Sequence, residues 1–120
     1  MLYDPKWNAE TETNPDEPWR ALLLRAAEVI EERGWTQGSY CDGDGGVCAM
    51  GAISVGAGYP PESIDGLANY VSGKAVMKLI KVIDPQGKFV DRIGSIPDWN
   101  DTRGRTKEEV IAALRTAAAS

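Results

Sequence analysis

Residues 18–34 read PWRALLLRAAEVIEERG and carry the clearest helical pattern in the chain. Apolar side chains recur there at the i, i+3, i+4, i+7 spacing that places them on one face of a helix: Trp19, Leu22, Leu23, Ala26, Ala27 and Ile30. Pro18 suits the first helical position, with Asp16 or Glu17 before it as the cap. Gly34 suits a left-handed end. The pattern predicts an amphipathic helix whose apolar face is buried in a core.

The residues after this first helix predict further helices along the chain. Residues 48–58 are rich in Gly and Ala and predict a short helix that a neighbouring helix can approach closely. A third helix is predicted over 61–71, and its expected buried residues are Ile64, Leu67, Ala68 and Val71. Ser72-Gly73 predicts a break or bend before another helix over 76–83.

The C-terminal third begins without a clear pattern. Residues 88–95 fit either a short helix or extended chain, and we expect Trp99, Asn100 and Asp101 to lie in a helix-free loop. Thr106 and Glu109 then match the capping box that starts a helix, here at about Lys107. The sequence therefore predicts an all-α fold, a compact bundle of about five helices that forms a single domain over residues 18–120.

A glycine-rich segment separates the first two helices. Residues 39–41 and 47–48 can pair as a short hairpin-like loop around the turn DGDGG. The Asp42-Gly43-Asp44 spacing resembles the start of a calcium loop, but Ile53 stands where such a loop needs a bidentate Glu. We expect a turn and no metal site.

Composition excludes several classes of function. The 120 residues hold 13 Lys and Arg, 18 Asp and Glu, no His and two Cys, for a net charge of −5. Without histidine, Ser-His-Asp and Cys-His catalysis are excluded, and two cysteines cannot form a four-ligand structural zinc site. The sequence predicts no metal and no other cofactor.

The negative charge is concentrated in residues 1–17, which hold five acidic residues and one lysine. We interpret 1–17 as an acidic N-terminal arm whose Tyr3 and Trp7 either dock on the domain or engage a partner. The arm lacks the features of a signal peptide, and no apolar stretch approaches the ~20 residues that span a bilayer. We therefore expect a cytoplasmic protein with no membrane association.

Two further expectations depend on the compartment and on charge. In a reducing cytosol, Cys41 and Cys48 are free thiols, whereas export would allow them to close a small disulfide loop. Lys74, Lys78 and Lys81 form a modest basic ridge, which is usually a solvated helix face. With the acidic balance, this ridge does not predict nucleic-acid binding.

Several short motifs carry a resemblance. They are Gly34-Trp35-x-Gln37-Gly38, Cys48-Ala-Met-Gly-Ala52, Trp99-Asn-Asp101, Gly104-Arg-Thr106 and Glu109-Val110. In this order they resemble a small domain family of actinobacteria and their bacteriophages that has no assigned activity. The resemblance extends from about Trp19 to Ala118. Thr36 stands where many relatives carry cysteine. The resemblance implies a helical bacterial or phage protein of the cytosol and supplies no reaction.

The motifs allow two interpretations of the site. Cys48 at a helix N-terminus could be a nucleophile with Asp101 orienting a water or substrate, but no histidine can act as its base. A small buried thiol is the simpler interpretation. Likewise, Trp99, Asn100 and Asp101 fit a docked indole and two side chains that bond nearby backbone, with a ligand site as the alternative.

The sequence therefore predicts a non-catalytic accessory protein, related to phage, that binds another protein. The predicted binding residues are aromatic and polar side chains of the arm and of the two motif loops: Tyr3, Trp7, Trp35, Gln37, Tyr40, Trp99, Asn100 and Asp101. The alternatives are a thiol-dependent enzyme that uses Cys48 and a virion or assembly component.

Overall fold

The computed structural model describes residues 17–87 and 92–120, and six helices and no strand lie within these ranges. The helices are α2 (Pro18–Arg33), α3 (Ala49–Gly56), α4 (Asp65–Ala68), α5 (Tyr70–Ile83), α6 (Arg92–Asn100) and α7 (Lys107–Ala118). The all-α prediction is confirmed, with one helix more than the expected five or so. None of these helices is both long and apolar enough to cross a membrane.

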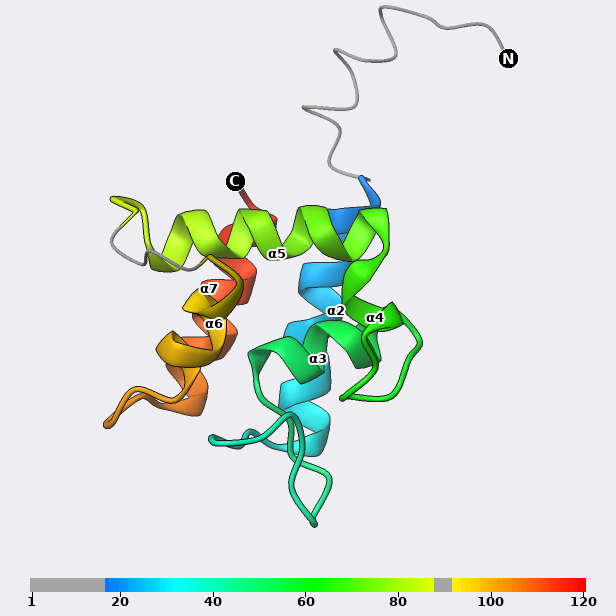
Figure 1. The fold of residues 1–120 in the computed structure, drawn as a ribbon, viewed down its shortest axis with the longest axis vertical. Coiled ribbons are helices and arrows are strands. Elements are labelled where there is room, and N and C mark those ends of the chain that lie inside the picture. The colour runs from blue at the N-terminus through cyan, green and yellow to red at the C-terminus, as the bar shows by residue number, and fades with distance from the viewer. Residues whose placement is uncertain (1–16, 88–91) are drawn as a thin grey trace, which may run out of the picture.

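Helix α2 packs between α7 and α3, and α5 crosses the start of α2 and the end of α7 (Figure 1). At that crossing, Arg20 Nη1 of α2 donates to the Ala118 carbonyl oxygen of α7 at 2.8 Å. The acidic arm, with Tyr3 and Trp7, lies outside the described residues apart from Glu17.

The first helix forms where its sequence predicts, although the Glu17 side chain before it makes no capping hydrogen bond. Pro18 is its first residue after Glu17, and all six residues of the predicted apolar face are buried. The helix ends where the Gly34 amide donates to the Ile30 carbonyl oxygen at 2.8 Å. Gly34 has a φ of 95° and a ψ of 170°, so the glycine adopts the expected positive φ, but the chain leaves the helix extended.

The loop after α2 is held by one central residue. Val47 forms a parallel bridge with Trp35 and an antiparallel bridge with Cys41, so the hairpin-like loop is present as isolated bridges without a ladder. Helix α3 then packs against α2. A Cβ on Gly56 would meet Leu22 Cδ1 at 3.1 Å, which confirms the predicted close approach of a second helix.

The break predicted at Ser72-Gly73 is wrong. Helix α5 runs through both residues without interruption and begins at Tyr70, because Asn69 Oδ1 accepts the Ser72 amide at 2.9 Å and so caps the helix. The predicted helix over 61–71 shrinks to the four residues of α4. Ile64, expected to be buried, is 79% exposed.

The helix-free loop predicted for residues 99–101 is also partly wrong. Helix α6 extends through Pro97 to Asn100, so Trp99 and Asn100 lie on the last turn of a helix. The final helix agrees with its predicted start. Glu109 Oε1 accepts the Thr106 amide at 2.9 Å, Thr106 Oγ1 accepts the Glu109 amide at 3.2 Å, and the capping box is complete.

Candidate functional site

Asn100 joins three of the motif segments. Its Oδ1 accepts the Trp35 indole N–H at 2.8 Å and the Ala49 amide at 3.0 Å. Its Nδ2 donates to the Thr36 carbonyl oxygen at 3.1 Å and to Asp101 Oδ1 at 2.9 Å. An asparagine amide has two donors and two acceptor sites, so this fully buried side chain uses its whole capacity. Asn100 thus fixes the glycine-rich loop and the start of α3 to the end of α6.

Two further motif side chains continue this network. Gln37 Nε2 donates to the carbonyl oxygens of Asn100 and Thr102, each at 3.0 Å. Asp101 Oδ1 accepts the Gly38 amide at 3.0 Å. The structure therefore brings Gln37, Asn100 and Asp101 together, as well as Trp35, and it uses their polar atoms to join two segments about sixty residues apart.

The other predicted aromatic residues differ in accessibility. Trp99 is partly buried against the core, and the Arg105 guanidinium lies 4.3 Å from the centre of its ring. Arg105 Nε also donates to the Trp99 carbonyl oxygen at 3.0 Å. Tyr40, by contrast, is 43% exposed and lies on the glycine-rich loop. Of the predicted residues that the structure describes, Tyr40 is the aromatic one that presents a large apolar surface to solvent.

Cys48 caps α3, and its Sγ accepts the Gly51 amide at 3.3 Å. The thiol is buried and borders a small cavity of about 160 Å³ that Tyr40 and Asp101 also line. Burial raises the pKa of the Cys48 thiol above its ordinary value, and the Asp101 charge raises it further. The protonated form therefore predominates at neutral pH, although thiolate is the nucleophilic form.

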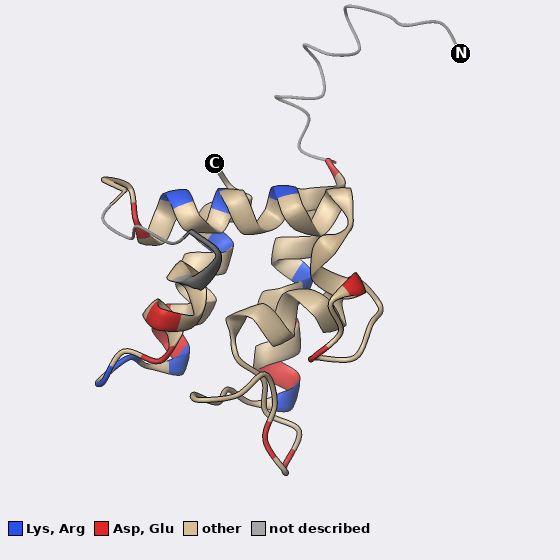
Figure 2. Ribbon diagram, in the orientation of Figure 1, with Lys and Arg blue, Asp and Glu red and all other residues tan. Residues whose placement is uncertain are grey.

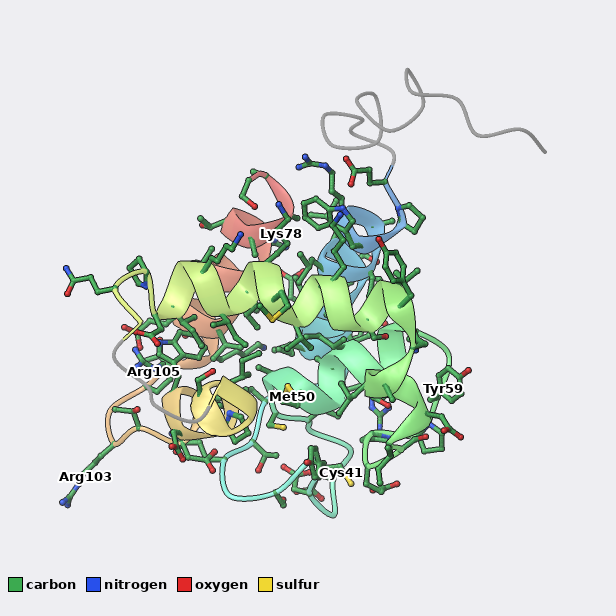
Figure 3. All side chains as sticks on the ribbon, turned by 45° about the horizontal axis from the view of Figure 1, so that its top comes forward. Cys41, Met50, Tyr59, Lys78, Arg103 and Arg105 are labelled. Atoms are coloured by element: carbon green, nitrogen blue, oxygen red, sulfur yellow. The ribbon has the colours of Figure 1, made fainter. Side chains whose placement is uncertain are left out.

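Cys41 is a second free thiol. It lies on the opposite side of the molecule from Lys78 (Figure 3), and its Sγ donates to Glu62 Oε2 at 3.3 Å. That hydrogen bond, with the nearby Glu62 charge, raises the pKa of the Cys41 thiol. Within residues 17–87 and 92–120, no cluster of three or more Cys, Asp or Glu side chains could hold a metal ion.

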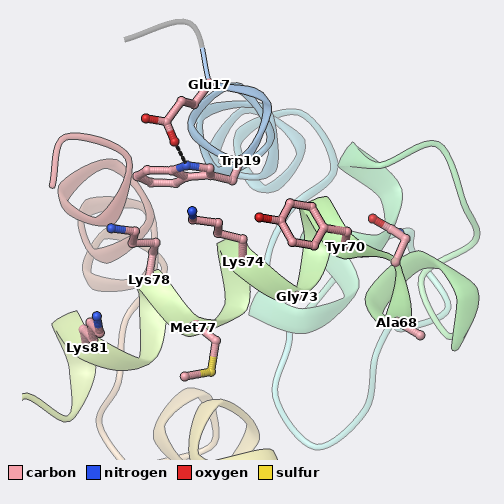
Figure 4. Close-up of a pocket in the computed structure, with 10 residues that line it drawn as sticks. Glu17, Trp19, Ala68, Tyr70, Gly73, Lys74, Met77, Lys78 and Lys81 are labelled. Carbon is pink, nitrogen blue, oxygen red and sulfur yellow. Dashed lines mark hydrogen bonds between the residues drawn. The ribbon is translucent and has the colours of Figure 1, made fainter. Parts of the chain in front are cut away.

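A larger concave surface lies on the other side of the fold. We call it the α5 groove, a cavity of about 750 Å³ between the start of α2 and the outer face of α5 (Figure 4). Its lining residues are Glu17, Trp19, Ala68, Asn69, Tyr70, Gly73, Lys74, Met77, Lys78 and Lys81. Tyr70 is 80% exposed and Met77 45% exposed, so the groove carries apolar surface that nothing in the described chain covers.

Trp19 forms one wall of the α5 groove. Arg20 Cζ lies 4.4 Å and Lys78 Nζ 4.7 Å from the centre of its ring, both within cation–π range. The Trp19 indole N–H donates to Glu17 Oε2. The other carboxylate oxygen of Glu17 is buried and has no hydrogen-bond partner among the described residues. This wall therefore holds one acceptor that lacks a donor.

The α5 groove is also positively charged. A row of Lys residues follows α5 in Figure 2, and Lys74, Lys78 and Lys81 all line the groove. Within the described part of the chain, none of these three lysines forms an ion pair. Glu17 is the single acidic residue among the lining residues.

Sequence reasoning found the lysine ridge but missed the groove. The signal available was the spacing of Tyr70, Lys74, Met77 and Lys81, which repeats at i, i+4, i+7 and i+11. This spacing defines a second face of α5, away from the aliphatic stripe. The other wall is formed by Trp19, which the sequence assigned to the core, and its contact with α5 depends on the tertiary fold.

Residues 14–120 match the profile of a family of unknown function, DUF6197, and the chain belongs to that family. The match covers all the described residues, so the Asn100 network and the α5 groove both lie in the family domain. Comparisons with curated proteins and with solved structures find no match.

Proposed function

We propose that this member of a family of unknown function is a small non-catalytic protein that binds another protein through the α5 groove. The observation that supports the proposal is the exposure of Tyr70 and Met77 beside a cavity of about 750 Å³. Single exposed apolar residues are ordinary, but a cluster around a concavity is typical of an interaction surface.

The chemistry of the groove suits a protein partner. Tyrosine and methionine are enriched at protein interfaces, and tyrosine is frequent among the residues that dominate binding energy. Tyr70 and Met77 are two helical turns apart on one face of α5, about 10 Å along the helix axis. A peptide or helix laid along α5 would contact both.

The motif loops are a weaker candidate for the main contact surface. The side chains of Trp35, Gln37 and Asn100 already form hydrogen bonds within the fold, and a partner that used the same atoms would have to break those hydrogen bonds. Tyr40 remains accessible and could extend the contact. We therefore place the main surface on α5 and leave Tyr40 as a secondary contact.

One observation favours the thiol-enzyme alternative, because Cys48 and Asp101 line the same small cavity. The proposal nevertheless assigns Cys48 a structural role. Its thiol is buried, its pKa is raised, and the Asp101 carboxylate that would orient a water or substrate already accepts two hydrogen bonds. If the origin in actinobacteria or their phages holds, the partner is an intracellular bacterial protein, and assembly into a virion is one form that such binding could take.

A site-specific photocrosslink tests the proposal. Tyr70 is replaced by p-benzoylphenylalanine, and the full chain is irradiated in a lysate of the organism that carries the gene. Ile64, 79% exposed but outside the groove, receives the same residue as a matched control. We expect a protein adduct at position 70 that is absent at position 64, resists nuclease and is lost when Met77→Ala is added.

The adducted protein is then identified by mass spectrometry and purified. Its Kd is measured against the wild-type chain and against Tyr70→Ala, and weaker binding by the variant supports the proposal. Equal adducts at positions 70 and 64, an adduct that nuclease removes, or an unchanged Kd would contradict it.

A further inference from the structure

The acidic segment of the chain enters the described structure at the α5 groove. Residues 1–16 contain four acidic residues and one lysine, together with Tyr3 and Trp7. They connect directly to Glu17, which lines the groove. We infer that residues 1–16 occupy the α5 groove of their own chain and compete there with the protein partner. This inference rests on the proposed function, because it names the occupant that regulates the same surface.

The charge of residues 1–16 is complementary to that of the α5 groove. The groove presents Lys74, Lys78 and Lys81, and within residues 17–87 and 92–120 no carboxylate pairs with any of them. Residues 1–16 carry four acidic side chains against one lysine and therefore have a net negative charge. Charges that face each other at short range favour association and fix its orientation. Covalent connection keeps the acidic segment at a high effective concentration near the lysines.

The buried carboxylate of Glu17 also favours an occupied groove. Its Oε2 accepts the Trp19 indole N–H, whereas its Oε1 is buried without a donor among the described residues. A buried acceptor without a partner costs free energy, and native structures rarely leave one unsatisfied. A backbone or side-chain N–H of an occupant in the groove would supply the missing donor.

The length of the segment permits this placement. Ten residues separate Trp7 from Glu17 and span up to about 33 Å when extended. The lining part of α5, from Tyr70 to Lys81, is about 17 Å long at 1.5 Å per residue. Trp7 can therefore reach any point of the groove, where Met77 and Tyr70 offer the sulfur and aromatic surfaces that favour contact with an indole.

The inference is tested on the purified full chain, without lysate. The chain with p-benzoylphenylalanine at position 70 is irradiated, digested and mapped by mass spectrometry. We expect a crosslink within one chain that joins position 70 to a peptide from residues 1–16, and no such crosslink from position 64. A crosslink between two chains would show that a second copy occupies the groove, and absence of any crosslink to 1–16 would also overturn the inference.

Charge reversal tests the cause of the contact. Lys74→Glu/Lys81→Glu leaves the contact between Lys78 and Trp19 in place. We expect this variant to lower the yield of the intrachain crosslink roughly tenfold, the factor that about 1.4 kcal/mol represents. The control is Arg103→Glu/Lys107→Glu, which changes net charge equally outside the groove lining. An equal loss of yield in both variants would contradict a specific role for the α5 lysines.

The two proposals can fail separately. If the lysate adduct at position 70 forms but the intrachain crosslink does not, the groove binds a partner and the inference about residues 1–16 is wrong. If the intrachain crosslink forms but no lysate protein is captured even after the acidic side chains of residues 1–16 are neutralised, the groove holds residues 1–16 and the proposed function is wrong. Removal of the negative charges of residues 1–16 should increase the yield of the lysate adduct if both are right.

Discussion

The indole N–H of Trp35 donates to Asn100 Oδ1 at 2.8 Å, although 65 residues separate the two along the chain. This hydrogen bond closes the loop after α2 onto the end of α6. The same Oδ1 also accepts the Ala49 amide at the first turn of α3. One buried amide therefore sets the relative position of a loop and two helices, and the stability of this region should depend on it.

Asn100→Ala should destabilise the fold by about 3 kcal/mol, because the indole of Trp35 and the amide of Ala49 would lose their buried acceptor. Urea unfolding followed by circular dichroism measures the change. Thr102→Ala is the control, since Thr102 is exposed and its hydroxyl bonds only the preceding helical turn. A loss below about 1 kcal/mol in Asn100→Ala would show that the network contributes little.

Local signals explain which parts of the fold were predictable. Pro18 begins α2 directly, and Thr106 and Glu109 form the capping box of α7 only three residues apart. Such short-range signals show from the sequence where these two helices begin. The α5 boundary was missed because Gly73 resembles a break, whereas the decisive residue is Asn69, whose side chain caps the helix. The packing of α5 on α2 and α7 offsets the cost of a glycine within the helix.

The candidate site was less predictable, because its parts meet only in three dimensions. Sequence motifs identified Trp35, Gln37 and Asn100 as special residues but could not show that these residues bond one another. Nor could they show that Trp19 lies over Lys78 to form a groove, since about sixty residues separate the two walls. Helical periodicity locates a face, whereas a groove requires the relative placement of two helices.

A pair of glycines gives opposite expectations for the same substitution. Gly51→Ala should destabilise the fold by about 2 kcal/mol, because the new Cβ would lie 2.3 Å from the Tyr40 carbonyl oxygen, which is backbone and cannot move freely. Gly73→Ala should stabilise it by about 0.5–1 kcal/mol, because α5 has open space there and alanine lowers the entropy of the unfolded chain.

Thermal or urea unfolding of the two variants checks this pair, and each variant serves as the control for the other. Equal effects of the two substitutions would contradict the close approach of the Tyr40 loop to α3. Destabilisation by Gly73→Ala alone would contradict the uninterrupted α5 helix.

The raised pKa of Cys48 predicts a pH dependence of stability. The ordinary thiol pKa is 9.0, and burial raises it in the folded chain, so the folded state retains the proton that the unfolded chain loses. The stabilising contribution is therefore complete below pH 9 and decreases as pH rises through the folded pKa. Unfolding free energies measured between pH 7 and about 10.5 should fall.

Cys48→Ser provides the control for this pH profile. Serine is also a good N-cap, so the variant keeps a cap for α3 but has no thiol to ionise. Its stability should fall less steeply above pH 9 than that of the wild-type chain. Parallel profiles for the two proteins would show that Cys48 is not buried enough to influence the titration.

Tyr70→Ala should weaken partner binding by roughly thirtyfold, since truncation of a central interface tyrosine typically costs about 2 kcal/mol. Its effect on folding stability should be within about 0.5 kcal/mol, because the side chain is 80% exposed. Ile64→Ala, at 79% exposure, controls for the loss of apolar surface outside the groove and should leave the Kd unchanged. Titration calorimetry with the purified partner and urea unfolding of each variant separate the two effects. A Kd that changes equally in both variants would mean that exposed apolar area, and not the α5 groove, determines binding.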